Sequence, residues 1–166
     1  YFFICMNEVY LQLGSNIGDR LDNLDQSIKI ITERIGNVLE KSSVYESTPW
    51  GVENQRNFLN QVIFVKSNFD PYTILDLVLQ IEKDMGRIRI EKWGERIIDI
   101  DILFINDLII ESENLCIPHE FIAKRKFVLQ PMCEIAPGFI HPKLNKTISQ
   151  LLEECIDDEK VNVYAT

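Results

Sequence analysis

Residues 97–105 read Ile97-Ile98-Asp99-Ile100-Asp101-Ile102-Leu103-Phe104-Ile105, and the assignment of the fold starts from them. Isoleucine and phenylalanine are enriched in β-strands, so the stretch predicts a strand in spite of its two aspartates. The strands and helices predicted before it then give the order of elements in the core, with this strand as the last.

A strand followed by a helix is predicted upstream. Residues 8–15 alternate apolar and polar side chains, which is typical of a β-strand. Asp19 is a suitable N-cap for the next segment, whose apolar residues recur every three or four positions until Gly36. This spacing predicts an amphipathic helix.

Two more strands and a second helix fill the region before residue 97. Residues 38–47 and 58–67 are rich in strand-forming residues, and the segment between them is too long for a tight hairpin turn. Asp70 and Pro71 are typical of a helix start, and Gly86 is expected to end that helix.

The order strand, helix, strand, strand, helix, strand predicts an α+β protein with a ferredoxin-like βαββαβ core. A short antiparallel addition over residues 108–111, after a turn at Asn106-Asp107, makes a small additional hairpin, and a C-terminal helix spans 147–154. A chain of 166 residues, 46% of them hydrophobic, suits one domain. We expect that domain to cover residues 6–160, with residues 1–5 as an upstream segment.

Composition limits the classes of function. The net charge is −9 and the pI is about 4.7, which argues against a general binder of nucleic acid or of an anionic membrane. The sequence has no apolar run long enough to span a membrane, and its four cysteines form no Cys-x-x-Cys pair. These features favour a cytoplasmic protein.

Two basic clusters stand out against this acidity. Five basic residues lie between positions 83 and 96, and a second cluster is Lys124-Arg125-Lys126. Such clusters in an acidic protein suggest a small, highly charged anion as ligand. The chain has neither a P-loop motif nor Gly-x-Gly-x-x-Gly, so arginines and a metal would have to hold any phosphate.

Asp99 and Asp101 are the candidate metal ligands. Side chains at positions i and i+2 of a strand project from the same face, so the two carboxylates are expected to lie close together. Oxygen ligands without histidine or cysteine suit Mg²⁺. The alternative is an edge strand whose aspartates only face water.

The remaining candidates have ordinary interpretations too. The arginines of residues 86–96 could bind phosphate oxygens and Trp93 could stack on a base, but the segment could equally be a solvated basic loop. His119 follows a proline, where a structural hydrogen bond is more common than catalysis. A zinc site with Cys116 lacks a further pair of ligands.

Taken together, the ordered motifs of this chain resemble the 6-hydroxymethyl-7,8-dihydropterin pyrophosphokinase family. The resemblance extends from about Val9 to Leu152. The segments that carry it are Leu11-Gln-Leu-Gly-Ser-Asn-Ile-Gly-Asp19, Thr48-Pro49-Trp50-Gly51, Phe58-Leu59-Asn60, Gly86-Arg87-Ile-Arg89, Trp93-Gly94-x-Arg96-x-x-Asp99-x-Asp101-Ile102, and Pro118-His119 to Arg125-x-Phe127.

The resemblance implies a monomeric enzyme that transfers the pyrophosphoryl group of ATP to the hydroxymethyl group of a reduced pterin, giving AMP, in folate biosynthesis. By resemblance, Asp99 and Asp101 hold two Mg²⁺ ions and act in catalysis with Arg87 and Arg96. The residues implied in ATP binding are Arg89, Trp93, Ile102, His119 and Arg125. Those implied in pterin binding are Thr48, Pro49, Trp50, Phe58, Asn60 and Phe127.

Three other classes of function stay open at this point. An RNA-recognition module has the same order of elements, but its aromatic and basic strand signature is absent here. A non-catalytic interaction domain would tolerate loss of either aspartate. A nucleotidyl or monophosphoryl transferase could use the same metal chemistry, and formation of ADP rather than AMP would identify a kinase of the ordinary kind.

Overall fold

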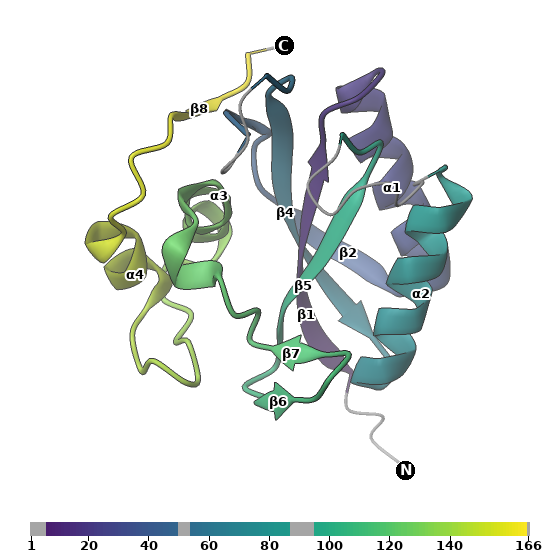
Figure 1. The fold of residues 1–166 in the computed structure, drawn as a ribbon. Helices are drawn as coiled ribbons and strands as arrows, with labels where there is room; N and C mark the ends of the chain where they lie inside the picture. Colours follow the sequence, from purple (N-terminus) through teal and green to yellow (C-terminus); the bar gives the residue numbers. More distant parts are fainter. Residues whose placement is uncertain (1–5, 50–53, 87–94, 166) are drawn as a thin grey trace.

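The computed structural model describes residues 6–49, 54–86 and 95–165. Its centre is an antiparallel sheet with strand order β5-β1-β4-β3-β8, in which β2 also pairs with β4 (Figure 1). The strands of this sheet are β1 (Asn7–Ser15), β2 (Asn37–Lys41), β3 (Tyr45–Ser47), β4 (Phe58–Ser67), β5 (Asp99–Ile105) and β8 (Val161–Val163).

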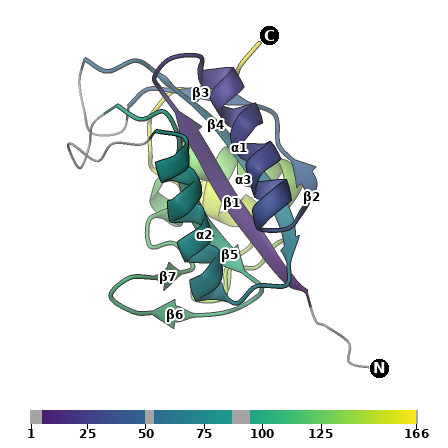
Figure 2. The same ribbon diagram turned by 90° about the vertical axis from the view of Figure 1, so that its right-hand side faces the viewer.

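Helices cover both faces of the sheet. Figures 1 and 2 show α1 and α2 side by side on one face, and α3 with α4 on the other. The helices are α1 (Arg20–Arg34), α2 (Pro71–Asp84), α3 (Lys126–Ile135) and α4 (Ile148–Glu154). The short turn η1 (Ile122–Lys124) precedes α3, and a separate hairpin is formed by β6 (Ile110–Glu111) and β7 (Cys116–Ile117).

Capping residues define where the helices begin. The Asp19 carboxylate accepts a hydrogen bond from the backbone N–H of Asp22 at 3.1 Å. The Asp70 carboxylate does the same for Tyr72 and Thr73, at 3.0 and 3.2 Å. These contacts satisfy backbone donors that have no partner inside the helix, so both predicted helix starts are confirmed.

Gly36 marks the turn between α1 and β2. A Cβ atom at this position would lie 2.1 Å from the backbone oxygen of Lys66. No side chain fits at that distance, so the chain leaves α1 by passing directly over β4. The Ser67 hydroxyl reinforces this contact by donating a hydrogen bond to the Ile35 oxygen at 2.7 Å.

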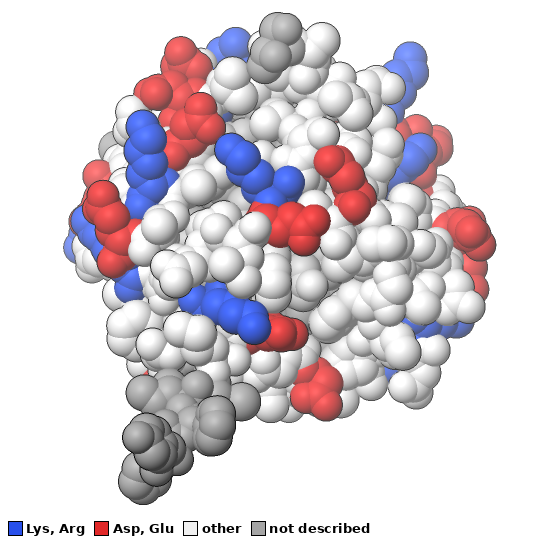
Figure 3. All heavy atoms as spheres, turned by 180° about the vertical axis from the view of Figure 1, so that it is seen from behind, with Lys and Arg blue, Asp and Glu red and all other residues white. Residues whose placement is uncertain are grey.

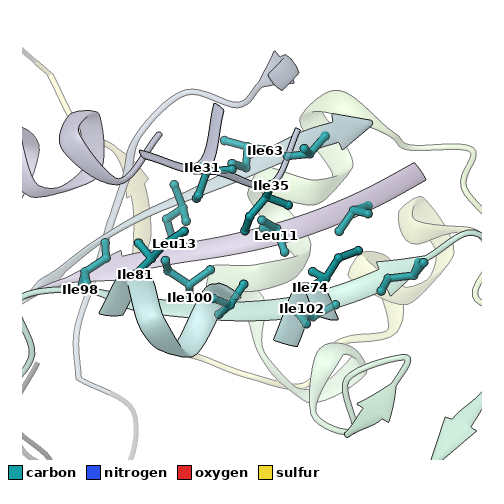
Figure 4. Packing of buried hydrophobic residues seen from close by; sticks show 14 of the residues in the cluster. Leu11, Leu13, Ile31, Ile35, Ile63, Ile74, Ile81, Ile98, Ile100 and Ile102 are labelled. Atoms are coloured by element: carbon teal, nitrogen blue, oxygen red, sulfur yellow. The ribbon is translucent and has the colours of Figure 1, made fainter. Parts of the chain in front are cut away.

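Alternation along the strands separates two hydrophobic cores. Between the sheet and α1 and α2, side chains from β1, β4, β5 and both helices interdigitate (Figure 4). A second core lies under α3 and α4 and includes Val62, Leu103, Phe104, Leu129 and Met132. The sheet is therefore covered on both faces.

A β-bulge interrupts the pairing of β1 with β5. Tyr10 is opposite Phe104 but Leu11 is opposite Ile102, so Leu103 is an extra residue in β5. Leu103 and Phe104 both pack in the core under α3 because of it. Beyond the bulge, Ile102 packs against α1 and α2 while Asp101 faces the α3 side.

The α+β class, the antiparallel sheet and the C-terminal helix are confirmed. The antiparallel addition predicted over 108–111 is shorter than expected, and its residues pair with β7 in a separate hairpin rather than with the strand before the turn. The prediction of a single strand over 38–47 is wrong, because residues 42–44 interrupt it and leave two strands, β2 and β3. There the Ser43 N–H and hydroxyl both donate to Glu134 of α3 instead of continuing the strand. Among the described residues, the helices are too short or too polar to cross a membrane.

Candidate active site

Three neighbouring strands supply the floor of a pocket on the α3 face of the sheet. In the register, Gly14 of β1 is opposite both Asn60 of β4 and Asp99 of β5, and Gln12 is opposite Asp101. Side chains two residues apart share a face, so these groups all project to the same side. The pocket is lined by Gln12, Gly14, Ser47, Thr48, Pro49, Gln55, Phe58, Asn60, Arg96, Asp99, Asp101, Arg125 and Phe127.

Asp99 and Asp101 form the acidic part of the pocket. The Arg96 guanidinium donates a hydrogen bond to the Asp99 carboxylate at 2.5 Å, and both side chains are about four-fifths buried, with 22% and 20% exposed. Behind the strand, the buried carboxylate of Glu82 on α2 accepts from the Ile100 N–H at 2.7 Å. That contact ties α2 to β5 between the two aspartates.

Asn16 connects two segments of the pocket rim. Its side-chain oxygen accepts from the Arg96 backbone N–H at 2.7 Å, and its backbone N–H donates to the Arg96 backbone oxygen at 3.1 Å. Its amide nitrogen donates to Gln55 and to the Arg56 oxygen at 3.4 and 3.3 Å. A buried amide thus joins the segment just before the aspartates to the segment just before β4.

The aromatic and basic wall of the pocket comes from the start of α3. Arg125 stacks against Phe121 and Phe127, with distances of 4.8 and 5.7 Å from its guanidinium carbon to the ring centroids. Burial lowers the pKa of Arg125, and the carboxylates of Asp101 and Asp99 oppose that effect. The aspartates and Arg125 are therefore close enough to interact electrostatically.

Phe58 and Asn60 project from β4 into the opposite side of the pocket. The Asn60 amide is buried and donates to the Ser47 hydroxyl at 2.8 Å and to the Tyr45 oxygen at 3.5 Å. These bonds fix its orientation. An aromatic ring on each side, Phe58 and Phe127, suits a flat heteroaromatic ligand.

Glu134 joins α3 to β3, which carries one edge of the pocket. Its carboxylate accepts from the Tyr45 hydroxyl at 2.7 Å and from Ser43. Burial raises the pKa of Tyr45 to about 12, and the bond to Glu134 adds to the effect. Although burial opposes it, the hydrogen bonds from Tyr45 and Ser43 lower the pKa of Glu134.

Arg20, at the start of α1, bridges the two chain segments that border residues 48–57. Its guanidinium donates to the Glu46 carboxylate at 2.8 Å and to the Asn57 oxygen at 2.7 Å. The ring of Tyr164 covers it, with 5.7 Å between guanidinium carbon and ring centroid. The side chain is only 9% exposed, so this contact is shielded from solvent.

The structure brings most described candidates into one pocket. Those that line it are Thr48, Pro49, Phe58, Asn60, Arg96, Asp99, Asp101, Arg125 and Phe127. Ile102 does not, because its side chain is buried in the core toward α1 and α2, so only its backbone could contact a ligand (Figure 4). Trp50, Arg87, Arg89 and Trp93 lie outside the described residues.

His119 lies beside the pocket and does not line it. Its ring Nδ1 accepts from the Phe121 backbone N–H at 3.3 Å, and the backbone N–H of His119 donates to the Leu103 backbone oxygen at 3.1 Å. Burial lowers its pKa, and the nearby Arg125 guanidinium acts in the same direction. This histidine therefore favours the neutral form.

Sequence reasoning missed three amide side chains, Gln12, Asn16 and Gln55. Each sits in or beside the pocket, and Gln12 and Asn16 are buried. A buried amide has no distinctive spacing, so only the interruption of an apolar strand by Gln12 could have indicated it. The residue Asn16, directly after β1, looked like an ordinary strand terminator.

The donor set around Asp99 and Asp101 fits Mg²⁺. Within residues 6–49, 54–86 and 95–165, no three histidine, cysteine, aspartate or glutamate side chains gather as a metal cage. Two carboxylates facing one pocket would leave most of the coordination shell to water and ligand oxygens. Mg²⁺ typically binds in that way, whereas Zn²⁺ needs more protein ligands.

Comparison with known proteins identifies relatives over most of the chain. The family described as 7,8-dihydro-6-hydroxymethylpterin-pyrophosphokinase (HPPK) matches residues 10–137. The 2-amino-4-hydroxy-6-hydroxymethyldihydropteridine pyrophosphokinase of Aquifex aeolicus is 43% identical over 150 residues, which are 90% of this chain and 92% of that protein. The enzyme of the same name from Bacillus subtilis is 42% identical, over 78% of each chain.

Some relatives are much longer. The folic acid synthesis protein FOL1 of Dictyostelium discoideum is 41% identical over 87% of this chain but only 22% of its own length. The crystal structure of Plasmodium falciparum HPPK-DHPS wild type with STZ-DHP superposes with a TM-score of 0.73 at 19% identity, over 90% of this chain and 43% of that one. At that identity the structural match supports the fold alone.

Proposed function

The chain belongs to the 7,8-dihydro-6-hydroxymethylpterin-pyrophosphokinase family, and from this premise we propose that its pocket transfers a pyrophosphoryl group from ATP to 6-hydroxymethyl-7,8-dihydropterin. The products are AMP and the pterin diphosphate, an intermediate for folate biosynthesis. The observation that supports the proposal best is that one pocket is lined by two carboxylates, a guanidinium and two aromatic rings. These belong to Asp99, Asp101, Arg96, Phe58 and Phe127.

The pocket offers separate surfaces for the two substrates. Phe58, Phe127 and the fixed amide of Asn60 suit a flat ring with a polar edge. Arg96 and Arg125 offer guanidinium groups for phosphate oxygens. The acceptor hydroxyl and the phosphate would thus meet above Asp99 and Asp101, on the floor between these surfaces.

The protein's part in the reaction is alignment and charge neutralisation. We assign to Asp99 and Asp101 the binding of Mg²⁺, which when bound would neutralise the triphosphate and acidify the attacking hydroxyl. Arg96 would then exchange its contact with Asp99 for the transferring group. Arg125, which keeps its charge despite burial, would steady the nucleotide phosphates. No strong general base is needed in this scheme.

Finer features of the protein belong to the same proposal. The order β5-β1-β4 followed by β2 and β3 supports a ferredoxin-like core. On the face drawn in Figure 3, the described Lys and Arg side chains lie interspersed with Asp and Glu, so this face carries no continuous basic patch of the kind that nucleic acid or an anionic membrane would need. We infer a monomer that works in the cytoplasm, and light scattering in solution tests its mass.

The decisive experiment incubates the protein with ATP, MgCl₂ and 6-hydroxymethyl-7,8-dihydropterin and quantifies AMP, ADP and pterin diphosphate. We expect equal amounts of AMP and pterin diphosphate, formed only when the pterin is present and lost when EDTA removes the metal. Formation of ADP would indicate monophosphoryl transfer. Absence of both nucleotides, from protein shown to be folded, would refute the proposal.

A further inference from the structure

Gln12 is a buried polar residue in the pocket floor with an unused hydrogen-bonding group. It lies in the middle of β1, is 3% exposed, and is opposite Asp101 in the register. Its Oε1 atom is buried and has no hydrogen-bond partner within the described part of the chain. A buried carbonyl oxygen without a partner costs folding free energy, so a group from a ligand is the natural partner.

The neighbouring contacts determine which way this amide points. The Gln12 Nε2 donates to the Leu13 backbone oxygen and to the Asn60 Oδ1, both at 3.4 Å. A backbone oxygen can only accept, so the nitrogen of the amide is fixed on that side. The oxygen therefore cannot be exchanged with the nitrogen without losing both contacts.

Asn60 is oriented in the same manner. Its Nδ2 donates to the Ser47 hydroxyl and to the Tyr45 backbone oxygen, which leaves its Oδ1 toward Gln12. An amide oxygen has two lone pairs, and Gln12 uses one of them. The floor of the pocket thus holds two amide oxygens, and both retain capacity to accept hydrogen bonds.

We propose that Gln12 is a specificity-determining residue whose Oε1 accepts a hydrogen bond from an N–H group on the amino-substituted edge of the bound ring. The inference deepens the proposed function and depends on it. A ring edge with N–H donors can form hydrogen bonds to the buried amide oxygens. A ring with a carbonyl oxygen at the same position would instead place two acceptors against each other. The ligand class is therefore a flat heteroaromatic that carries an exocyclic amino group.

The substitution Gln12→Met tests the assignment, because methionine has nearly the same length and no acceptor oxygen of this kind. With a non-hydrolysable ATP analogue and MgCl₂ present, we expect the Kd of 6-hydroxymethylpterin to rise about tenfold, the loss of one good hydrogen bond. The Kd of the ATP analogue should change by less than about twofold. The melting temperature without ligand should change little, since removal of an unpaired buried oxygen offsets the loss of the two long contacts of Nε2 at 3.4 Å.

Gln61 provides the matched control. It is a glutamine of the adjacent strand β4, is 4% exposed, and does not line the pocket. Its Nε2 donates to the Ser42 backbone oxygen at 2.7 Å. Gln61→Met should therefore lower the melting temperature and leave the Kd of the pterin unchanged, the reverse of the pattern for Gln12→Met.

A second ligand separates the ring from a metal-bound water as the partner of Gln12. In 6-hydroxymethyllumazine an oxygen replaces the exocyclic amino group of the pterin. The wild-type protein should prefer the pterin, and Gln12→Met should lose most of that preference. If the preference is unchanged and only the MgCl₂ concentration needed for binding shifts, Gln12 contacts a metal-bound water and the inference is wrong.

The remaining outcomes are also decisive. An unchanged pterin Kd in Gln12→Met overturns the inference but leaves the proposed function intact. A wild-type protein that binds no pterin and forms no AMP overturns the proposed function itself. If Gln12→Met fails to fold, Gln12→Ala adds no bulk to the pocket floor, and the ratio of pterin to lumazine affinity in that variant decides the matter.

Discussion

At the scale of single residues, the two aspartates of β5 have different surroundings. Arg96 donates to Asp99 at 2.5 Å, whereas Asp101 lies opposite Gln12 in the strand register. Both should be essential if they hold the metal. Replacing Asp99 also removes the carboxylate that holds Arg96, so its loss should affect the position of the arginine as well.

We predict that Asp99→Asn and Asp101→Asn each lower kcat by roughly a thousandfold, because each removes one carboxylate from the metal site. The AMP assay measures the effect, and circular dichroism checks the fold. Asp107→Asn, an exposed position in the turn after β5, is the control and should keep the wild-type rate. A rate within about twofold of wild type in either β5 variant would show that the carboxylates are incidental.

The residues of the site were unequally predictable from sequence. Two charges inside an apolar strand are conspicuous, so residue type and spacing point to Asp99 and Asp101, which the structure places in the pocket. Gln12 and Asn16 are uncharged amides, whose sequence context is the same in a core, a turn or a site. Their importance depends on strand register and on contacts with residues far along the chain, such as Asn60 and Arg96.

At the scale of elements, α1 contributes more to the site than its distance from the aspartates indicates. Its first residue, Arg20, joins Glu46 in the middle of β3 to Asn57 just before β4. These are the two sides of the segment that carries Thr48 and Pro49. One buried guanidinium therefore holds the base of the proposed pterin-binding segment together.

Arg20→Met should raise the KM of the pterin roughly fivefold while the KM of ATP changes little, because the pterin-binding segment loses its anchor. It should also lower the free energy of unfolding by about 1 to 3 kcal/mol, since Glu46 and the Asn57 oxygen lose a charged donor. Steady-state kinetics and urea unfolding measure the two effects.

Arg34 offers a matched control at the other end of the same helix. It pairs with Asp84 at 2.5 Å, but both side chains are well exposed, at 40% and 39%. Exposed pairs contribute about 0 to 1 kcal/mol, so Arg34→Met should have little effect on stability and none on either KM. Equal effects of the two substitutions would contradict the anchoring role of Arg20.

Local signals predicted some elements well and others poorly. Apart from the interruption between β2 and β3, the strands and helices up to residue 86 follow from alternation, helical spacing and caps such as Asp19 and Asp70. Helix α3 was missed because Pro131 lies inside it. Strand β8 was missed because three residues carry almost no pattern, and pairing with β3 is what makes them a strand.

At the scale of the whole molecule, the C-terminal segment connects the α3 side of the protein to the edge of the sheet. After α4, the Asp157 carboxylate accepts from the Lys126 N–H at the start of α3, and β8 then pairs with β3. Glu159 lies between these contacts. Burial raises the pKa of Glu159 to about 7, and the nearby charges of Asp157 and Asp158 add to the effect.

The sign of this shift gives a prediction about pH. A carboxyl whose pKa is raised by folding favours the folded state when protonated, so its contribution is present below its ordinary pKa and is lost as the pH rises through about 7. Glu159→Gln, which cannot ionise, should therefore raise the melting temperature by a few degrees at about pH 8 and very little at about pH 5.

Thermal melts of wild type and Glu159→Gln across this range test the point, with the exposed Glu153→Gln as control. A gain that is the same at every pH would mean that ionisation of Glu159 is not its cause.

The extra residue at Leu103 breaks the alternation of β5, so that odd-numbered and even-numbered side chains of this strand share one face of the sheet. Phe104 on one side of the bulge and Asp101 and Asp99 on the other all project toward α3. Strict alternation through residues 99–105 would instead place the two aspartates on the face opposite Phe104. Deleting Leu103 would restore regular pairing and keep Asp101 opposite Gln12 and Asp99 opposite Gly14, because Ile102 is already paired with Leu11 and Phe104 with Tyr10. A one-residue deletion at the bulge is therefore predicted to spare the two carboxylates and to lower stability, because the core under α3 loses the buried Leu103 side chain.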